Sequence, residues 1–344
     1  MKKDCIISTI ICFFLIVSSL CAFAGTEATR SFIIRANNDF FKRSKNPSSD
    51  RRYTHGSSFG YINKANSLIE KFIHKDASDE FYSSLILLQD IYTPDDTEAI
   101  VPPDNEHPYS GEIDLIFGLH LRKKNSDKLG ANLHTLYSAE VSLGATGTYS
   151  FAENCQKGIH RMINNDIPQG WEHQLASHFS TRLSMAVKRR ISYMISKDLG
   201  LAIQAIGHIG GDLGNTLVQV ATGGEIRLGW NLPDDFGTFA QGPGSIASNI
   251  QGVNGVLTSP GDRYGFYMIL MAEGKYVNYN YHIGEKVAPI REVGELGIGW
   301  GFAKSRVYLP AFKFELCYIH RTEDFEEQDG PHRYGTASLV FPLN

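Results

Sequence analysis

The segment 111–123 decides the fold class, because its apolar residues recur at every second position. It reads Gly-Glu-Ile-Asp-Leu-Ile-Phe-Gly-Leu-His-Leu-Arg-Lys, and its alternating apolar residues are Ile113, Leu115, Phe117, Leu119 and Leu121. The positions between them are mainly polar. A period of two places successive side chains on opposite faces of a β-strand. The segment therefore predicts a long strand with one apolar face and one polar or small-residue face.

The same alternation recurs along most of the chain. Twelve strand-like segments can be counted, at 31–40, 53–63, 80–92, 111–123, 131–145, 173–190, 198–210, 216–232, 263–275, 290–302, 306–321 and 332–343. An even number suits a bacterial outer-membrane barrel, in which the apolar face meets lipid and the polar face lines the lumen. A soluble sandwich would also alternate, but a signal peptide and the absence of a later apolar run of about 18 residues favour the barrel. The predicted fold is all-β, a twelve-stranded antiparallel transmembrane β-barrel.

The first 24 residues have the pattern of a secretory signal peptide. Residues 2–3 are lysines, residues 6–20 are apolar, and residues 22–24 read Ala-Phe-Ala, a small-x-small cleavage site. We expect cleavage after Ala24 and a barrel domain over residues 25–344. Of the five cysteines only Cys155 and Cys317 remain in the mature chain, and we interpret them as two unconnected thiols.

The composition excludes two classes of protein. The chain has 344 residues, with Lys+Arg 33 against Asp+Glu 37, a net charge of −4 and a pI near 6.3. A nucleic-acid-binding protein would need a basic surplus to neutralise phosphates, so we expect no nucleic-acid partner. With 42% hydrophobic residues the chain can bury a core, which excludes a disordered protein.

One exterior loop has a helix signal. With the N-terminus on the periplasmic side, the loop 146–172 faces outward, and Ser150-Phe151-Ala152-Glu153 has the form of a capping box whose helix runs to about Asn164. Gln156 and His160 are four residues apart and share a face of that helix. A neighbouring apolar stripe of Cys155, Ile159 and Ile163 is expected to pack on the barrel rim and to aim Gln156 and His160 at the barrel wall. The later segment 234–262, rich in Gly, Pro, Ser and Asn, is expected to form one long loop.

Polar residues distant in sequence are expected to meet at the exterior rim. Asn38 and Asp39 end the first predicted strand there, and Thr54 opens the second at the same height. Carboxylate, amide and hydroxyl oxygens suit a hard cation such as Ca²⁺, and His160 nearby could deprotonate water. Because side chains alternate along a strand, we expect His55 to point to the face opposite Thr54.

These residues stand in a longer series of motifs. The series is Asn38-Asp39-Phe40-Phe41, Asp50-Arg51-Arg52-Tyr53-Thr54-His55-Gly56, Tyr92-Thr93-Pro94, Pro108-Tyr109-Ser110-Gly111, Gln156 with His160, Gly170-Trp171-Glu172-His173-Gln174-Leu175, and Asn231-Leu232-Pro233-Asp234-Asp235-Phe236-Gly237. In these motifs and their order the chain resembles the LpxR-type lipid A 3'-O-deacylases of Gram-negative outer membranes. The resemblance spans nearly all of the mature chain. It implies a twelve-stranded barrel with its active site between the outer wall and a loop helix, and a calcium-dependent mechanism like that of phospholipase A2, without a serine nucleophile.

By position, the resemblance also implies roles for single residues. Asp39 and Asn38 would hold Ca²⁺ and polarise the ester carbonyl, and His160 would be the general base. Thr54 and Gln156 would position water or substrate, and Asp166 would be an auxiliary acidic group. The implied reaction removes the 3'-linked acyl (acyloxyacyl) chain from lipid A of lipopolysaccharide. We therefore expect a monomer in the outer membrane, surrounded by its lipid, with the active site facing the cell exterior.

A basic run near the first exterior loop could bind the substrate. Arg51 and Arg52 belong to it, and at the outer leaflet their guanidinium groups would meet lipid A phosphates and carboxylated core sugars. A solvated loop is the alternative interpretation of the same residues.

Two other functions remain open. The first is a non-enzymatic barrel, either a pore or a surface-binding protein, although bulky inward residues such as His120, Lys313 and Glu315 would leave little channel. The second is an outer-membrane phospholipase with a Ser-His pair. Residues 56–60 read Gly-Ser-Ser-Phe-Gly and match G-x-S-x-G, but that motif needs a strand, a tight turn and a helix, and here it continues into a strand.

Overall fold

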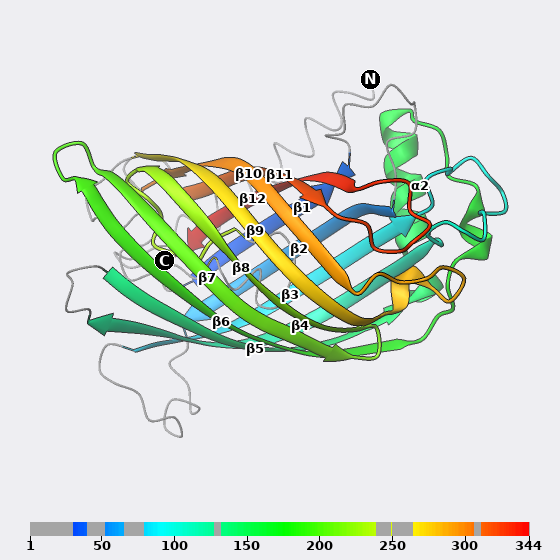
Figure 1. Cartoon of the computed structure of the whole chain (residues 1–344), viewed down its shortest axis with the longest axis horizontal. Helices are drawn as coiled ribbons and strands as arrows, with labels where there is room; N and C mark the ends of the chain where they lie inside the picture. The colour runs from blue at the N-terminus through cyan, green and yellow to red at the C-terminus, as the bar shows by residue number, and fades with distance from the viewer. Residues whose placement is uncertain are drawn as a thin grey trace.

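The chain forms a closed barrel of twelve antiparallel strands (Figure 1). The computed structural model describes residues 30–39, 52–64, 79–126, 132–238, 249, 264–305 and 311–343. The strands are β1 (Arg30–Asn38), β2 (Arg52–Lys64), β3 (Glu80–Thr93), β4 (Ser110–Ser126), β5 (Asn132–Thr146), β6 (Phe179–Ser196), β7 (Leu201–Gly214), β8 (Leu217–Trp230), β9 (Tyr264–Asn280), β10 (Glu292–Lys304), β11 (Phe312–Arg321) and β12 (His332–Leu343). The predicted fold class is confirmed. The expected signal peptide lies outside the described residues.

Each strand pairs with its neighbours in sequence, and the first pairs with the last. The β1–β12 register runs from Arg30 opposite Leu343 to Asn38 opposite Gly335. This pairing leaves no open sheet edge. A sheet can span a lipid bilayer only in this closed form, because every backbone N–H and C=O group then has a partner within the sheet.

One predicted strand was misplaced. The sixth was expected at 173–190, but β6 spans Phe179–Ser196. The reason is the short 3-10 helix η4 (Gly170–His173), which buries Trp171 in the loop before the strand begins. Residues 173–178 thus continue the loop.

The two faces of the barrel differ as the alternation predicts. On β4, Phe117 is 49% exposed on the outer face, while Asp114, His120 and Arg122 are buried inside. The exposed apolar side chains form the surface that meets lipid. No helix in the described part of the chain is long and apolar enough to cross a membrane.

The connection after β8 turns into the barrel. We call residues 231–238 the inner plug, because Asp234 and Asp235 bind basic side chains of the wall. Asp234 Oδ1 accepts from Arg190 at 2.6 Å and from Arg122 at 2.7 Å. Asp235 accepts from Arg227 at 2.7 Å and from Lys313. The expected long loop therefore begins as a packed segment inside the barrel.

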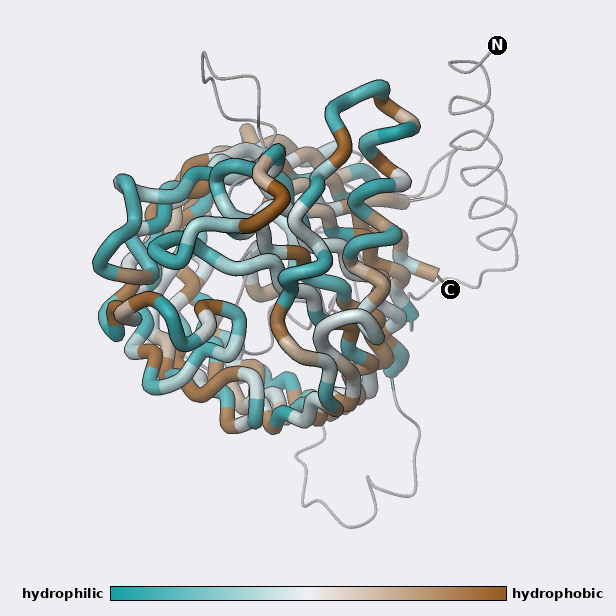
Figure 2. The backbone as a smooth tube through the Cα atoms, turned by 90° about the vertical axis from the view of Figure 1, so that its right-hand side faces the viewer, coloured by the Kyte–Doolittle hydropathy of each residue, from teal (hydrophilic) through white to brown (hydrophobic). Residues whose placement is uncertain are grey.

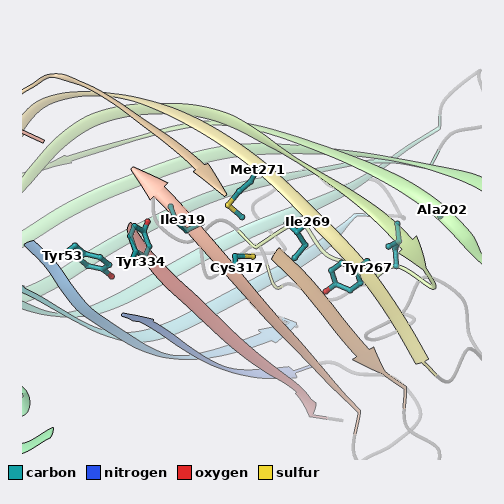
Figure 3. Packing of buried hydrophobic residues seen from close by; sticks show 9 residues of the cluster. Tyr53, Ala202, Tyr267, Ile269, Met271, Cys317, Ile319 and Tyr334 are labelled. Atoms are coloured by element: carbon teal, nitrogen blue, oxygen red, sulfur yellow. The ribbon is translucent and has the colours of Figure 1, made fainter. Parts of the chain in front are cut away.

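Apolar residues fill another part of the interior. Inward-pointing side chains of β9, β11 and β12 form a cluster with Tyr53 of β2 (Figure 3); its members include Tyr267, Ile269, Met271, Cys317, Ile319 and Tyr334. The Cys317 thiol is buried in this cluster and Cys155 is half-buried on the loop helix, and neither forms a disulfide. The prediction of two unconnected thiols is confirmed.

The loop helix lies at one end of the barrel. Helix α2 (Ala152–Ile163) follows the 3-10 helix η3 (Gly147–Ser150) in the connection between β5 and β6. Figure 1 shows it at the end where β1 stops and β2 starts, and Figure 2, which looks onto that end, shows it at the margin of the ring rather than over its centre. We call this end of the barrel the α2 end.

The predicted capping box does not form. Phe151 is the N-cap residue, with a left-handed φ of 57°, and its side chain makes no cap. The Ser150 Oγ accepts from the Ala152 N–H at 3.3 Å, and not from the Glu153 N–H as a capping box requires. The Glu153 carboxylate binds Lys157 at 2.7 Å, one turn further along the helix, instead of reaching back to the cap. The helix itself ends at Ile163, as the sequence predicts.

Candidate functional site on the outer wall

Three of the predicted site residues lie in one corner of the α2 end. Asn38 is the last residue of β1, and its Nδ2 donates to the backbone oxygen of Thr54 at 3.1 Å. The next residue, Asp39, has a fully buried side chain. The Thr54 hydroxyl lies 2.7 Å from the hydroxyl of Thr93 at the end of β3. Hydrogen bonds therefore join the ends of β1, β2 and β3 through amide and hydroxyl groups.

A β-bulge in β2 decides which way these residues point. Tyr53 pairs with Tyr92 and His55 pairs with Ile91, so Thr54 is the extra residue between them. His55 also lies opposite Asn38. Directly paired residues share a face of the sheet. Asn37 faces inward and bonds the inward Tyr53 hydroxyl at 2.8 Å, so its neighbour Asn38 faces outward, and His55 with it.

The expectation that His55 points away from Thr54 was therefore wrong. Thr54 contacts Thr93, which lies two residues from Ile91 on the same outer face of β3. A bulge inserts one residue and interrupts the alternation of side chains, so Thr54 and His55 both lie on the outer side.

Helix α2 packs directly on the strands beside this corner. A Cβ added at Gly111 of β4 would lie 2.2 Å from the Ala152 Cβ, so only glycine allows the helix to lie so close. The Gln89 amide of β3 donates to the Ser150 backbone oxygen at 2.7 Å. Ala152 also packs with Ile91 under the helix. The first turn of α2 is thus held against β3 and β4, next to the Thr54 corner.

The face of α2 toward the barrel differs from the expected one. Its buried residues are Ala152, Gln156 and His160, whereas Ile163 of the predicted apolar stripe is 57% exposed. Gln156 and His160 do lie on the wall side, but small and polar residues make that contact. Of the other stripe residues, Cys155 packs against the buried cluster beneath the helix, and Ile159 is half-buried.

Gln156 is held by a residue that we did not assign a role from the sequence. Trp171 is fully buried in η4 and its indole Nε1 donates to Gln156 Oε1 at 2.7 Å. The indole ring packs on Tyr109, with 4.8 Å between ring centroids. This contact fixes the Gln156 amide, because its oxygen must point to the indole.

His160 is oriented by the backbone just beyond its own helix. Its Nδ1 contacts the carbonyl oxygen of Asp166. A carbonyl only accepts, so Nδ1 carries the hydrogen and Nε2 carries the lone pair in the neutral ring. Asp166 therefore acts through its main chain, and its exposed carboxylate is not the group that meets the histidine. The left-handed Asn164, at φ 59°, turns the chain back to make this contact.

Of the two predicted substrate-binding arginines, the structure describes Arg52, which is buried. Arg52 is 2% exposed, and its guanidinium binds both Glu106 carboxylate oxygens at 3.3 Å and stacks on Phe325 at 5.8 Å. In this arrangement it ties the loop 94–109 to the barrel and is not presented to a phosphate. Arg51 lies outside the described residues.

The same loop provides a buried histidine that is not a base at neutral pH. His107 stacks on Tyr92 with ring centroids 5.3 Å apart, and its Nδ1 bonds the Pro108 oxygen at 2.8 Å. Burial lowers the pKa of His107 to about 4. The ring therefore stays neutral and structural.

The chain is similar to known proteins both in sequence and in structure. The protein-family model described as outer membrane protein LpxR matches residues 9–343. The chain belongs to the LpxR family. LpxR from Salmonella typhimurium is similar in structure, with a TM-score of 0.65 and 18% sequence identity over 90% of this chain and 99% of that one. The translocator domain of the autotransporter NalP from Neisseria meningitidis gives a TM-score of 0.40 and 8% identity, over 98% of this chain and 97% of that one. Curated protein sequences gave no match.

Membership of the LpxR family agrees with the barrel and its lipid-facing band. The protein is an outer-membrane protein, from the family of lipid A deacylases that its motifs resemble. Within this LpxR barrel, Asn38, Thr54, Gln156 and His160 lie at the outer wall of the α2 end. Motif residues Asp234 and Asp235 instead belong to the inner plug in the lumen.

The oxygen-rich corner is compatible with calcium. The Asp39 carboxylate, the Asn38 amide and the Thr54 carbonyl are hard oxygen ligands, the type that Ca²⁺ prefers. Among the described residues no group of three or more His, Cys, Asp and Glu side chains could hold a metal ion. Because Ca²⁺ takes six to eight oxygens, this corner would need backbone, water and substrate oxygens to complete the shell.

Proposed function

We propose that this outer-membrane barrel hydrolyses the 3'-linked acyl ester of lipid A. One observation carries the proposal. Asn38 and Thr54 form a polar corner on the outer wall, with the buried Asp39 next in the chain, beside a helix whose buried face presents Gln156 and His160. Polar groups on a lipid-facing wall cost free energy unless they bind a polar partner there. The ester at the end of an acyl chain is such a partner.

His160 is the general base in this proposal. The Asp166 carbonyl fixes the hydrogen on Nδ1, so Nε2 accepts a proton from water as the water attacks the ester carbonyl. The imidazolium then returns that proton to the sugar oxygen as the ester bond breaks, which yields a free fatty acid and a free 3'-hydroxyl. Gln156, held by Trp171, and Thr54, held by Thr93, orient the water or the substrate.

Calcium is the proposed cofactor. When bound by Asp39 and Asn38, Ca²⁺ would supply Lewis-acid polarisation of the ester carbonyl. The buried Asp39 carboxylate would contribute the charge that holds the cation. Chelation with EDTA should therefore abolish turnover, and added Ca²⁺ should restore it, with heat-modifiable migration in SDS gels unchanged. Full turnover in excess EDTA would contradict the metal's role.

Two features weaken the competing functions. The inner plug and wall residues such as Lys313, fully buried, fill the lumen near the β8–β9 end, which does not suit a pore. Ser58, the serine of the G-x-S-x-G match, faces the interior at 3% exposure and borders an internal cavity. It does not lie at a strand-to-helix elbow, so Ser58 is not suited to be the nucleophile of a Ser-His phospholipase.

Mass spectrometry of lipid A tests the function. Cells that express the protein should contain lipid A lighter by one 3'-linked acyl chain, and cells without the gene should not. The His160→Ala protein, matched in amount and in heat-modifiable folding, should leave lipid A unchanged. Identical lipid A in all three strains would contradict the proposal.

A further inference from the structure

A second polar pair lies on the outer wall, on the membrane side of the candidate site. His55 Nε2 is 2.6 Å from Ser57 Oγ, and both side chains are partly exposed. Residues two apart on a strand share a face, so Ser57 points outward like His55. The next outward residue, Phe59, is 43% exposed in the apolar band. His55 and Ser57 thus stand between Thr54 and the lipid.

The surrounding strands place this pair beside the residues assigned to catalysis. Across one side of β2, Asn38 is opposite His55 and Ala36 is opposite Ser57. Across the other side, Ile91 is opposite His55 and Gln89 is opposite Ser57. Since Ile91 and Gln89 both contact the start of the α2 region, the pair lies on the strip of wall that leads from the site into the membrane.

The acyl chain of a bound ester would follow that strip. With its carbonyl at Asn38 and Thr54, the chain must run toward the hydrocarbon, and its first carbons pass His55 and Ser57. A plain fatty acyl chain has only CH₂ groups there, which cannot bond an imidazole or a hydroxyl. A 3-hydroxyacyl or 3-acyloxyacyl chain has an oxygen two carbons beyond the carbonyl, where polar groups of the wall can bind it.

We propose that His55 and Ser57 bind the oxygen on carbon 3 of the acyl chain and so select 3-oxygenated chains over plain ones. The proposal rests on the deacylase function and names the feature of the acyl group that the site recognises. Thr54 and His55 share the outer face only because of the bulge. The bulge therefore places Thr54 beside the ester and His55 where it can bind the acyl chain.

Two lipid A esters of equal length, one with a 3-hydroxyacyl and one with a plain acyl chain, test the proposal. The wild-type protein should hydrolyse the hydroxylated ester faster. Ser57→Ala and His55→Leu should each lower this selectivity ratio about 3- to 10-fold, the effect of one lost hydrogen bond to the substrate. Ser58→Ala is the matched control, because this serine faces the interior and should keep the wild-type ratio.

Binding separates this proposal from the deacylase function. If the wild-type protein hydrolyses neither ester, the deacylase proposal fails. The His160→Ala protein in micelles should still bind the hydroxylated lipid more tightly, and Ser57→Ala in that background should remove the preference.

Two outcomes would overturn the assignment. One is an unchanged ratio, in turnover or in binding, for both Ser57→Ala and His55→Leu. The other is complete loss of turnover on both esters in folded Ser57→Ala, with wild-type Ser57 labelled by a fluorophosphonate, which would make Ser57 a nucleophile and not a chain-reading group.

Discussion

The lumen and the outer wall of this barrel use polar side chains in opposite ways. Inside, carboxylates and guanidinium groups pair densely, as between Arg227 and its partners Glu225, Asp235 and Glu315. On the outer wall beneath α2, mostly neutral hydrogen bonds join a few residues, such as Asn38 to Thr54 and Trp171 to Gln156. We propose that the densest cluster of charge stabilises the fold and that the sparse cluster carries the chemistry. A search for ionisable residues alone would lead to the lumen, on the other side of the wall from the proposed site.

The largest expected difference between the two regions is in turnover. His160→Ala should lower it about 10²- to 10⁴-fold, because the attacking water loses its proton acceptor. His120 is the lumenal counterpart, bonded to Ser84 at 2.9 Å and Ser138 at 3.0 Å, and His120→Ala should retain turnover. Release of fatty acid from lipid A in detergent measures both. Equal losses in two folded variants would remove the distinction between wall and lumen.

A pair of aspartates should separate stability from activity. Asp235→Asn removes the buried carboxylate that pairs with both Arg227 and Lys313. It should cost about 3 kcal/mol in the free energy of unfolding, the low end for a broken buried pair, because Glu315 still pairs with both cations. Asp39→Asn should abolish turnover and leave that free energy nearly unchanged. Urea unfolding in detergent, followed by heat-modifiable migration, measures the first effect. An equal loss of unfolding free energy in Asp39→Asn and Asp235→Asn would contradict the separation of stability from activity.

The loop 94–109 should make the α2 end sensitive to acid. Burial lowers the pKa of His107 from 6.5 to about 4. Between these two pH values the histidine is therefore protonated in the unfolded chain and neutral in the folded chain. This contribution to stability is complete above pH 6.5 and is lost as the pH falls toward 4, by about 2 kcal/mol between pH 7 and pH 5. His107→Phe keeps a ring against Tyr92 and should flatten this part of the pH dependence. An unchanged slope of unfolding free energy against pH would contradict the assignment.

The smallest expected effect concerns the orientation of Gln156. Trp171→Phe removes the indole N–H and should lower kcat about tenfold with little change in stability. The double variant with Gln156→Leu should be no slower than Gln156→Leu alone, because both act through one amide. Tyr109→Phe is the control. It removes a hydroxyl that donates to the Thr97 oxygen at 3.2 Å and leaves the indole N–H of Trp171 in place, so kcat should stay at the wild-type value.

The fold was predictable because its signal is local. In 111–123 every second side chain meets lipid, and so period two predicts both the strand and its faces. The corner of Asn38 and Thr54 was predictable from the positions of strand ends. The bulge was not, because it depends on how β2 pairs with β1 and β3. The alternation rule therefore gave the wrong face for His55.

Two other features depend on contacts that no local pattern encodes. In the sequence, Asp234 and Asp235 have the pattern of loop residues. In the structure Asp234 binds Arg122, 112 positions away in the chain, and Asp235 binds Arg227, 8 positions away, both inside the barrel. Trp171 stands in a motif that was recognised, but its hydrogen bond to Gln156 spans 15 positions and requires the η4 turn. In both cases the missing information was tertiary.

The outward face of the candidate site also fixes how it would meet its substrate. A lipid can reach Asn38 and Thr54 from the side, by lateral diffusion in its own leaflet, without crossing water or entering the lumen. The encounter then takes place in two dimensions, and its rate depends on the surface density of the lipid and not on its concentration in the bulk. Diluting lipid A with another lipid at constant total amount should therefore slow turnover in proportion to mole fraction, whereas diluting the whole suspension should not.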